Sequence, residues 1–407
     1  DETATRVIFY VAARGHHADI GGITPGSMPA NSVSVEQEGV LLNNIKIVDQ
    51  GQFLEKEMRQ LLSSGDFPAR NIDTNIADFK AQLAACEKGM QELLRVVRHY
   101  TLDVVHAYMR HVQNNAEESV RRVLERVDDG AFSYTMDDGS KIQVAISVDK
   151  VRRQATIDFS GSSPQHESNF NAPTAITRAA VLYVFRCLVD DQIPLNEGCL
   201  KPLTIILPPD CMLNPQYPAA VVAGNVETSQ AIVDALLGAL KVTAASQGTM
   251  NNVIWGNQEF QYYETLCGGE GASPGHHGCS AVHTHMTNSR LTDPEVLESR
   301  FPVTLESFAI RRGSGGDGRY RGGDGVVRRV RFHQSMQLSL LTGHRKIAPY
   351  GMQGGQPGLT GVNLLLKAGG QSVTLGSTDS VQLSPGDAIE ISTPGGGGFG
   401  QPLPAKT

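Results

Sequence analysis

The sequence predicts an α+β fold, with mixed helices and sheets and a β-rich C-terminal unit. Apolar residues recur at helical spacing in the first third of the chain, and apolar and polar residues alternate further on. Short β-like runs divided by glycine-rich turns fill the last quarter. Because 407 residues exceed what one ordinary core accommodates, we expect several packed units. They are a loop and helical region at 1–130, an α/β core with Gly-rich and His-rich loops at 131–300, and a β-rich domain at 301–407.

The N-terminal region is predicted to contain a strand, a loop and then helices. The apolar run at residues 7–12 is typical of a strand, and residues 21–31, rich in Gly, Pro and Ser, predict a loop. Between residues 75 and 127 the apolar spacing predicts two or three amphipathic helices. We expect the charged face of the last helix to lie in water. Its charged residues are Glu117, Glu118, Arg121, Arg122 and Glu125.

The middle region is predicted to alternate strands with helices. Alternating segments at 141–148 and 154–159 predict a hairpin-like pair of strands. A helix at 177–188 and a buried strand at 203–207 follow. Another helix is predicted to begin near Thr228, because an apolar stripe starts there and the hydroxyl of Thr228 or Ser229 could cap it.

The C-terminal unit is predicted to be built of strands. Four short runs of β-forming residues are separated by glycine-rich segments that are typical of tight turns. These runs lie at residues 326–332, 337–341, 362–366 and 388–392.

Composition excludes several classes of protein. The chain has 35 Lys and Arg against 42 Asp and Glu, a net charge of −7, so it lacks the cationic surface that nucleic-acid binding needs. No stretch approaches the roughly 20 apolar residues that cross a bilayer, so we expect no membrane span. The six cysteines contain no C-x-x-C pair, which favours free thiols in a reducing, cytoplasmic compartment.

The sharpest local motif is R-G-H-H-A-D at residues 14–19, between the predicted strand and the glycine-rich loop. Imidazole and carboxylate groups together suit Zn²⁺, Mn²⁺ or Fe²⁺. Because adjacent residues of an extended segment point to opposite faces, one of His16 and His17 would be a ligand and the other a hydrogen-bonding neighbour. Two ordinary histidines near a turn remain the alternative.

Two further segments could bind a ligand. In His283-Thr284-His285, alternate residues of a strand would present two imidazoles on one face, although solvated loop histidines explain the pattern equally well. Residues 223–230 precede an apolar helix and offer N–H groups and hydroxyls to a carboxylate or phosphate. Ordinary helix capping is the alternative there. A P-loop is excluded because the chain has no Gly-Lys dipeptide.

Taken together, these motifs resemble the hydantoinase B/oxoprolinase family. The resemblance starts with F-Y-V-A-A-R-G-H-H-A-D-I-G-G-I-T-P-G-S-M-P at residues 9–29 and covers essentially the full chain in the expected order. The further motifs are G-N-V-E-T-S-Q (224–230), S-Q-G-T-M-N-N (246–252), V-H-T-H-M-T-N (282–288), R-R-G-S-G-G-D-G-R-Y-R-G-G-D-G (311–325) and T-P-G-G-G-G-F-G (393–400).

The resemblance implies a reaction in two parts. In such systems an ATP-binding half or subunit of the hydantoinase A type, with Mg²⁺ on its ATP, phosphorylates the amide oxygen of a small cyclic amide. The B-type half then completes ring opening with water, which would convert 5-oxo-L-proline to L-glutamate. Related members open hydantoins or carboxylate ketones, so a hydantoinase or ketone carboxylase subunit is an alternative. A non-catalytic scaffold fragment is another, and we expect an oligomer.

The resemblance also implies roles for individual residues. His16 matches the family's metal-binding histidine, and His17 and Asp19 are its expected catalytic neighbours. The family's other metal ligands come from an upstream H-x-x-D type motif that this sequence lacks, so we expect part of a metal site on a piece of a longer polypeptide. His16, His17 and Asp19 are the expected catalytic residues, and His16 and Asp19 the expected metal ligands. The residues expected to bind substrate are Arg14, Asn225, Thr228, Ser229, His283 and His285.

Overall fold

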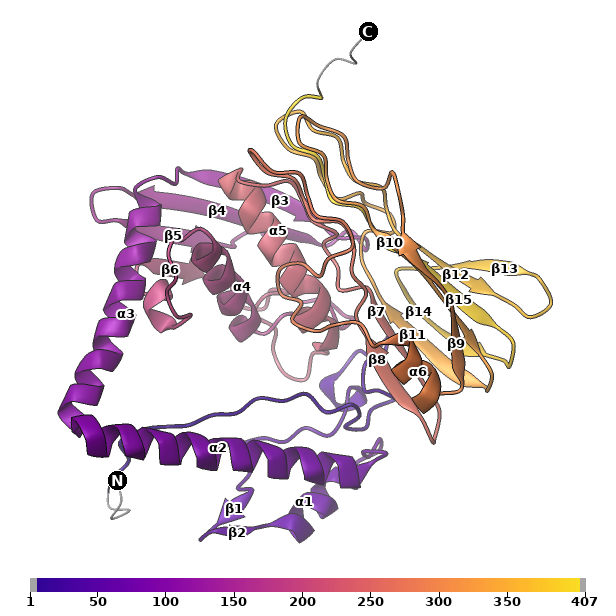
Figure 1. The fold of residues 1–407 in the computed structure, drawn as a ribbon, viewed down its shortest axis with the longest axis horizontal. Coiled ribbons are helices and arrows are strands. Elements are labelled where there is room, and N and C mark those ends of the chain that lie inside the picture. The colour runs from indigo at the N-terminus through magenta and orange to yellow at the C-terminus, as the bar shows by residue number, and fades with distance from the viewer. Residues whose placement is uncertain (1–5, 403–407) are drawn as a thin grey trace.

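The computed structural model describes residues 6–402, in which helices and several sheets are combined as the α+β prediction requires (Figure 1). A long helical arm borders one side of the molecule. A four-stranded sheet with two buried helices lies above it, and two further sheets form the C-terminal end. The predicted fold class is confirmed.

The predicted N-terminal strand is wrong. Residues 7–17 run along the first long helix without pairing with any strand (Figure 1). The Cys86 thiol contacts the carbonyl of Val11 at 3.9 Å, and a Cβ on Gly89 would lie 2.8 Å from the Val11 side chain. The segment therefore lies along a helix without a β-ladder, and it stays open to solvent, since Val7 and Tyr10 are 66% and 93% exposed. The short elements that follow are η1 (Val35–Gln37), β1 (Val48–Asp49), β2 (Gln52–Phe53) and α1 (Glu55–Leu62).

The predicted amphipathic helices are confirmed as α2 (Ile72–Tyr100) and α3 (Leu102–Leu124). Thr101, with a φ of 69°, forms the corner between them. The buried residues of α2 all lie between Asn75 and Phe79, and most of those of α3 lie beyond residue 115. We call residues 80–115 the arm. Val105 is its one buried residue.

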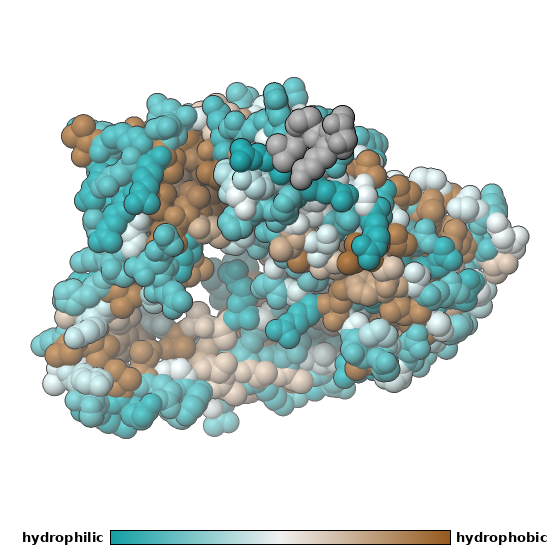
Figure 2. Space-filling view, turned by 45° about the horizontal axis from the view of Figure 1, so that its top comes forward, coloured by the Kyte–Doolittle hydropathy of each residue, from teal (hydrophilic) through white to brown (hydrophobic). Residues whose placement is uncertain are grey.

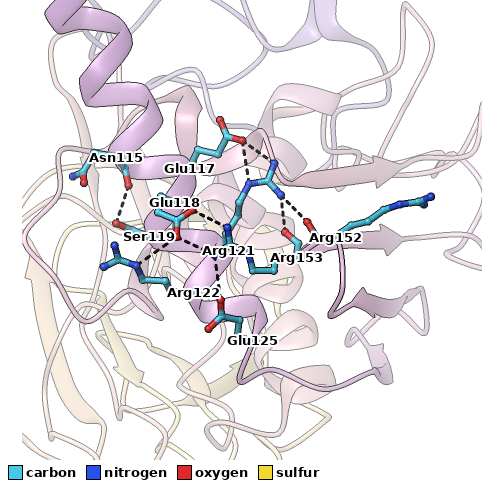
Figure 3. Close-up of polar contacts among 9 residues, drawn as sticks. All are labelled: Asn115, Glu117, Glu118, Ser119, Arg121, Arg122, Glu125, Arg152 and Arg153. Atoms are coloured by element: carbon cyan, nitrogen blue, oxygen red, sulfur yellow. Dashed lines mark hydrogen bonds and ion pairs between the residues drawn. The ribbon is translucent and has the colours of Figure 1, made fainter.

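The end of α3 is fastened to the turn between two strands (Figure 3). Arg121 Nη1 donates to the carbonyls of Arg152 and Arg153, at 3.0 and 2.9 Å. The Arg153 guanidinium in turn contacts Glu118 at 2.9 Å and Glu125 at 3.1 Å. The expectation of a fully solvated charged face is therefore wrong in part, because Arg121 and Glu117 are half-buried against this turn.

The middle of the chain forms a sheet in the order β3-β4-β5-β6. The predicted hairpin is confirmed, since β4 (Lys141–Asp149) pairs antiparallel with β5 (Gln154–Asp158), and β3 (Gly130–Thr135) lies on the other side of β4. The strand β6 (Leu203–Ile206) is a parallel edge strand in which only Leu203 is buried, so the prediction of a buried strand there is wrong. An edge position leaves one side of the strand in solvent.

Two helices bury the apolar face of this sheet. The predicted helices are confirmed as α4 (Thr174–Cys187) and α5 (Ser229–Leu240), and η2 (Glu197–Leu200) packs beside α3. A π-helical turn, η3 (Gly224–Thr228), precedes α5, and no side-chain hydrogen bond caps it. The predicted capping is therefore wrong. A Cβ on Gly224 would lie 2.1 Å from the Asn171 carbonyl, so this turn requires glycine.

The C-terminal end consists of two sheets, and the predicted strands there are confirmed. One sheet has the order β13-β12-β15-β10-β9 and the other the order β14-β11-β7-β8, with apolar side chains packed between them. Because β7 and β8 come from the middle region, the second sheet crosses the predicted boundary at residue 300. The strands are β7 (Asn252–Gly256), β8 (Gln261–Glu264), β9 (Val303–Ile310), β10 (Val326–Phe332), β11 (Met336–Leu341), β12 (Val362–Leu366), β13 (Ser372–Leu375), β14 (Thr378–Leu383) and β15 (Ala388–Ser392), with α6 (Pro294–Arg300) before β9.

Within residues 6–402, none of the helices is both long enough and apolar enough to pass through a bilayer.

Candidate functional site

The carboxylate of Asp19, in the first motif, holds a loop together. One oxygen accepts from the N–H groups of Gly21 and Arg70 at 2.9 and 3.1 Å. The other accepts from the Gly26 N–H at 3.0 Å and pairs with the Arg70 guanidinium at 2.9 Å. The side chain is buried, 2% exposed. Four donors satisfy this carboxylate, which explains how the residue can be buried with its charge.

His17 is held in a fixed orientation. Its Nδ1 lies 2.7 Å from Asp78 Oδ2, and its ring meets Phe79 edge-on with the centroids 5.0 Å apart. The other ring nitrogen, Nε2, has no hydrogen bond to the described residues. A carboxylate on one nitrogen and a free second nitrogen is the arrangement that metal-ligating histidines show. His16 and Arg14 are exposed.

The first motif does not by itself form a complete metal site. The described residues contain no group of three or more His, Cys, Asp or Glu placed to hold one ion. His16 and the Nε2 of His17 could supply imidazole donors, but Asp19 has both oxygens engaged. The donor set therefore fits a divalent ion only in part, with the Nε2 of His17 as the donor that the structure orients.

The His283-Thr284-His285 segment is a turn rather than a strand. His285 has a φ of 51°, in the left-handed region, so the two imidazoles do not share a strand face. His285 Nε2 lies 3.3 Å from Asp234 Oδ1 of α5, and Nδ1 lies 3.4 Å from the Tyr183 hydroxyl of α4. Both ring nitrogens of His283 are buried without a partner, and burial lowers its pKa. Neither histidine is exposed to solvent, so the alternative of solvated loop histidines is wrong here.

The helix α5 joins the second and third motifs. Gln230 Nε2 donates to the Thr284 carbonyl at 3.1 Å, one turn before the contact between Asp234 and His285. The hydroxyls of Thr228 and Ser229 donate to the carbonyls of Phe170 and Asn225, both at 2.6 Å, and both residues are buried. Asn225 is exposed. No hydrogen bond or ion pair within the described range links these residues to His16 or His17.

A cavity of about 120 Å³ lies beside the π-helical turn. It is lined by the end of β3, the start of α5, the segment that follows β11 and the start of β14. Glu227, which the sequence motif contains but which was not predicted as a site residue, lines it. Glu227 Oε1 accepts from Thr249 Oγ1 at 2.9 Å, the Met250 N–H at 3.0 Å and Asn252 Nδ2 at 2.7 Å.

Burial determines the protonation of this cavity. It raises the pKa of Glu227 to about 8, so the carboxyl is protonated at neutral pH. Burial also lowers the pKa of His344 and raises that of Tyr134. The Tyr134 hydroxyl lies 2.5 Å from His344 Nε2. Perturbed acids and bases that line one cavity are typical of functional sites.

Sequence reasoning missed Asp78, Glu227, Tyr134 and His344. Glu227 had one available signal, because it lies within the G-N-V-E-T-S-Q motif at residues 224–230. Asp78 and Tyr134 lie 61 and 210 positions from their histidine partners, so no local pattern could indicate either pair.

Comparison with known proteins gives one consistent result. The family described as hydantoinase B/oxoprolinase matches residues 1–402. A 5-oxoprolinase from Dictyostelium discoideum is 46% identical over 97% of this chain and 32% of its own length. The protein 5-oxoprolinase 1 from Arabidopsis thaliana is 43% identical over 97% of this chain and 33% of its own. The chain thus spans about a third of the length of these relatives.

A solved structure supports the fold. The crystal structure of an ATP-dependent caprolactamase from Pseudomonas jessenii superimposes with a TM-score of 0.80, covering 96% of this chain and 72% of the other at 24% identity. At this identity the likeness concerns the fold. The sequence match extends from end to end and the fold agrees with it, and we conclude that the chain belongs to the hydantoinase B/oxoprolinase family.

Proposed function

We propose that this chain is the B-type portion of an ATP-dependent 5-oxoprolinase, which opens 5-oxo-L-proline with water to give L-glutamate. The observation that carries the proposal is the 46% identity over 97% of the chain to a protein named 5-oxoprolinase. An amide carbonyl is a poor electrophile, and phosphorylation of its oxygen creates a leaving group. We assign the ATP and its Mg²⁺ to a hydantoinase A-type partner half, as the resemblance to the family implies.

We also propose that a divalent ion, Zn²⁺, Mn²⁺ or Fe²⁺, binds beside His16 and His17. When bound, such an ion supplies a water molecule of lowered pKa as nucleophile. Asp78 fixes the ring of His17 through Nδ1, so that Nε2 points away from the carboxylate. Asp19 positions the loop that carries the histidines instead of ligating the ion. The remaining ligands would come from outside the described residues.

The arm supports the proposed partner. Its exposed apolar side chains gather on two successive helices, and Figure 2 shows apolar surface on that side of the molecule. Contiguous exposed apolar surface is typical of protein interfaces. The longer relatives carry the additional polypeptide that could cover it. The exposed side chains are Met90, Val96, Tyr100, Val104, Tyr108, Met109 and Val112.

We place the complete enzyme in the cytoplasm, as an oligomer. All six cysteines are free thiols in the structure, which suits a reducing compartment.

The test uses the full-length protein, in which this chain is joined to the additional polypeptide of the longer relatives. We expect ATP hydrolysis coupled to glutamate formation from 5-oxo-L-proline, and little turnover of hydantoin or acetone. Preference for hydantoin would favour the hydantoinase alternative, and bicarbonate-dependent consumption of acetone the carboxylase. No turnover of any substrate would favour the scaffold alternative.

Variants test the residue roles separately. His17→Ala should lower both metal content, measured by elemental analysis, and glutamate formation. Asp19→Asn should lower the free energy of unfolding by about 3 kcal/mol, because it disrupts a buried ion pair. Full metal content in His17→Ala would contradict the proposed ion site. Unchanged stability of Asp19→Asn together with lost metal would show instead that Asp19 is a ligand.

A further inference from the structure

One oxygen of Glu227 opens onto the cavity described above. Oε1 is occupied by three donors, whereas Oε2 accepts no hydrogen bond from the described residues and is not sealed within the protein. The residue itself is 2% exposed. A buried carboxyl group that keeps one free oxygen in a cavity is costly unless something polar occupies the space.

Two glycines keep this space open. A Cβ on Gly343 would lie 3.1 Å from Glu227 Oε2, and a Cβ on Gly248 would lie 2.3 Å from His344 Nε2. Gly248 also has a φ of 61°, which favours glycine. Any side chain at either position would fill the cavity next to its polar groups.

The floor of the cavity is uncharged. His344 Nδ1 lies 2.5 Å from the Ile347 carbonyl, which can only accept, so the ring proton sits on Nδ1. His344 Nε2 then accepts from the Tyr134 hydroxyl at 2.5 Å. The two side chains satisfy each other and leave Glu227 Oε2 as the free polar atom at this depth.

The mouth of the cavity offers donors and a positive charge. Lys346 lines it and is exposed, and no carboxylate of the described residues lies within ion-pair distance of its ammonium group. The nearby acids are engaged. Asp137 accepts from the N–H groups of residues 345–347, and Asp138 pairs with His166 at 3.1 Å. The hydroxyls of Thr135, Ser377 and Thr378 are also without hydrogen bonds to described residues.

This arrangement defines the chemistry of a ligand. A neutral polar group fits at the deep end and an anion at the mouth. A cavity of about 150 Å³ is known to hold benzene, so about 120 Å³ suits one five-membered ring. We propose that this cavity binds a small lactam that bears a carboxylate, with its carbonyl oxygen at Glu227 Oε2 and its carboxylate at Lys346. The inference rests on the proposed function and assigns a binding site for its substrate.

The protonation of Glu227 agrees with this placement. Burial raises its pKa to about 8, and because Oε1 takes three donors the proton belongs on Oε2. The group then donates to a carbonyl oxygen and does not repel an anion. Arg345 and Asp137 face it as well, the first lowering and the second raising its pKa.

The test is calorimetric titration of the full-length protein with 5-oxo-L-proline, pyrrolidin-2-one and L-proline. Pyrrolidin-2-one lacks the carboxylate and L-proline lacks the ring carbonyl. Gly343→Ala should weaken binding of 5-oxo-L-proline at least about tenfold, because the added methyl group fills the space beside Glu227 Oε2 and removes a buried hydrogen bond to the ring carbonyl. Gly369→Ala, where a Cβ meets nothing within 4 Å, is its matched control and should bind normally.

Two more variants assign the ends of the ligand. Lys346→Ala should reduce the affinity for 5-oxo-L-proline to that for pyrrolidin-2-one, whereas Lys56→Ala, an exposed lysine of α1, should not. Glu227→Gln should retain binding, because an amide also donates, and Glu227→Ala should lose it. The retained binding of Glu227→Gln separates a loss of contact from a loss of folding.

The outcomes separate this inference from the proposed function. If the full-length protein turns over 5-oxo-L-proline but Gly343→Ala and Lys346→Ala bind it as the unmodified protein does, the cavity is not the site and the function stands. If the protein binds 5-oxo-L-proline in a way that Gly343→Ala abolishes but forms no glutamate, the site stands and the function fails.

Discussion

The helix α5 and the arm are both helical and rich in apolar residues, but they are stabilised in different ways. Of the 12 residues of α5, 11 are buried between the middle sheet and the loops around residues 244–287. In the arm, by contrast, Val105 is the one buried residue of a stretch that is three times as long. Helices in proteins owe most of their stability to a buried face, so α5 is supported by this chain and the arm has little support from it.

The polar groups of the two regions also differ in burial. Around α5, Glu227, Gln230 and Asp234 are buried, and each retains an oxygen that accepts no hydrogen bond from residues 6–402. Along the arm, ion pairs such as Lys88 with Glu92 are solvent-exposed and contribute little. Chemistry is therefore expected where the chain buries polar groups, and association where it exposes apolar ones.

The largest predicted effect is a difference in stability between equivalent truncations. Leu236→Ala in α5 should lower the free energy of unfolding by about 2–5 kcal/mol, because the side chain is fully buried. Met90→Ala in the arm should change it by less than about 0.5 kcal/mol, because this side chain is 43% exposed. Urea denaturation measures both. Equal losses would show that the arm is packed as tightly as α5.

A second prediction concerns the pH dependence of the free energy of unfolding that arises from Glu227, just before α5. The folded chain keeps the proton up to a pKa of about 8, whereas the unfolded chain releases it near 4.5. The contribution of Glu227 to stability is therefore fully present below pH 4.5. It decreases as the pH rises to about 8, by at most about 1.4 kcal/mol per pH unit. His344 has a lowered pKa and acts in the opposite direction, losing stability towards acid.

Glu227→Gln isolates this contribution. In urea melts between pH 5 and pH 8, the difference between the unmodified chain and the variant should change steadily with pH in favour of the variant. A constant difference across this range would show that Glu227 is ionised in the folded state and would contradict the role of burial.

The smallest effect is expected where the end of α3, just beyond the arm, meets the middle sheet. Arg153→Ala removes ion pairs to Glu118 and Glu125, but the arginine side chain is 33% exposed, so the cost should stay below about 1 kcal/mol. Arg152→Ala is the control, because its side chain is 77% exposed. Hydrogen exchange of the end of α3 should increase only in the first variant. A loss as large as that of Leu236→Ala would mean that the arm depends on this contact.

Local patterns predicted most of the elements. The helical spacing of residues 75–127 is realised in α2 and α3, and the alternation of residues 141–159 in β4 and β5, because these periods reflect one buried face of each element. The strand prediction for residues 7–12 failed, because an apolar run does not specify whether the segment pairs in a sheet or lies along a helix. Capping by Thr228 failed because a π-helical turn, which its hydroxyl does not cap, begins four residues earlier.

The sequence by itself determined the family, the fold class and the motifs, because residue spacing and identity are local properties of the chain. Only the tertiary structure decided that Asp78 orients His17, that Asp19 secures a loop, and that Tyr134 and His344 close a cavity beside Glu227. These partners are brought together by chain segments that lie far apart in sequence. Their burial, which sets protonation and leaves polar atoms free, arises only when those segments pack.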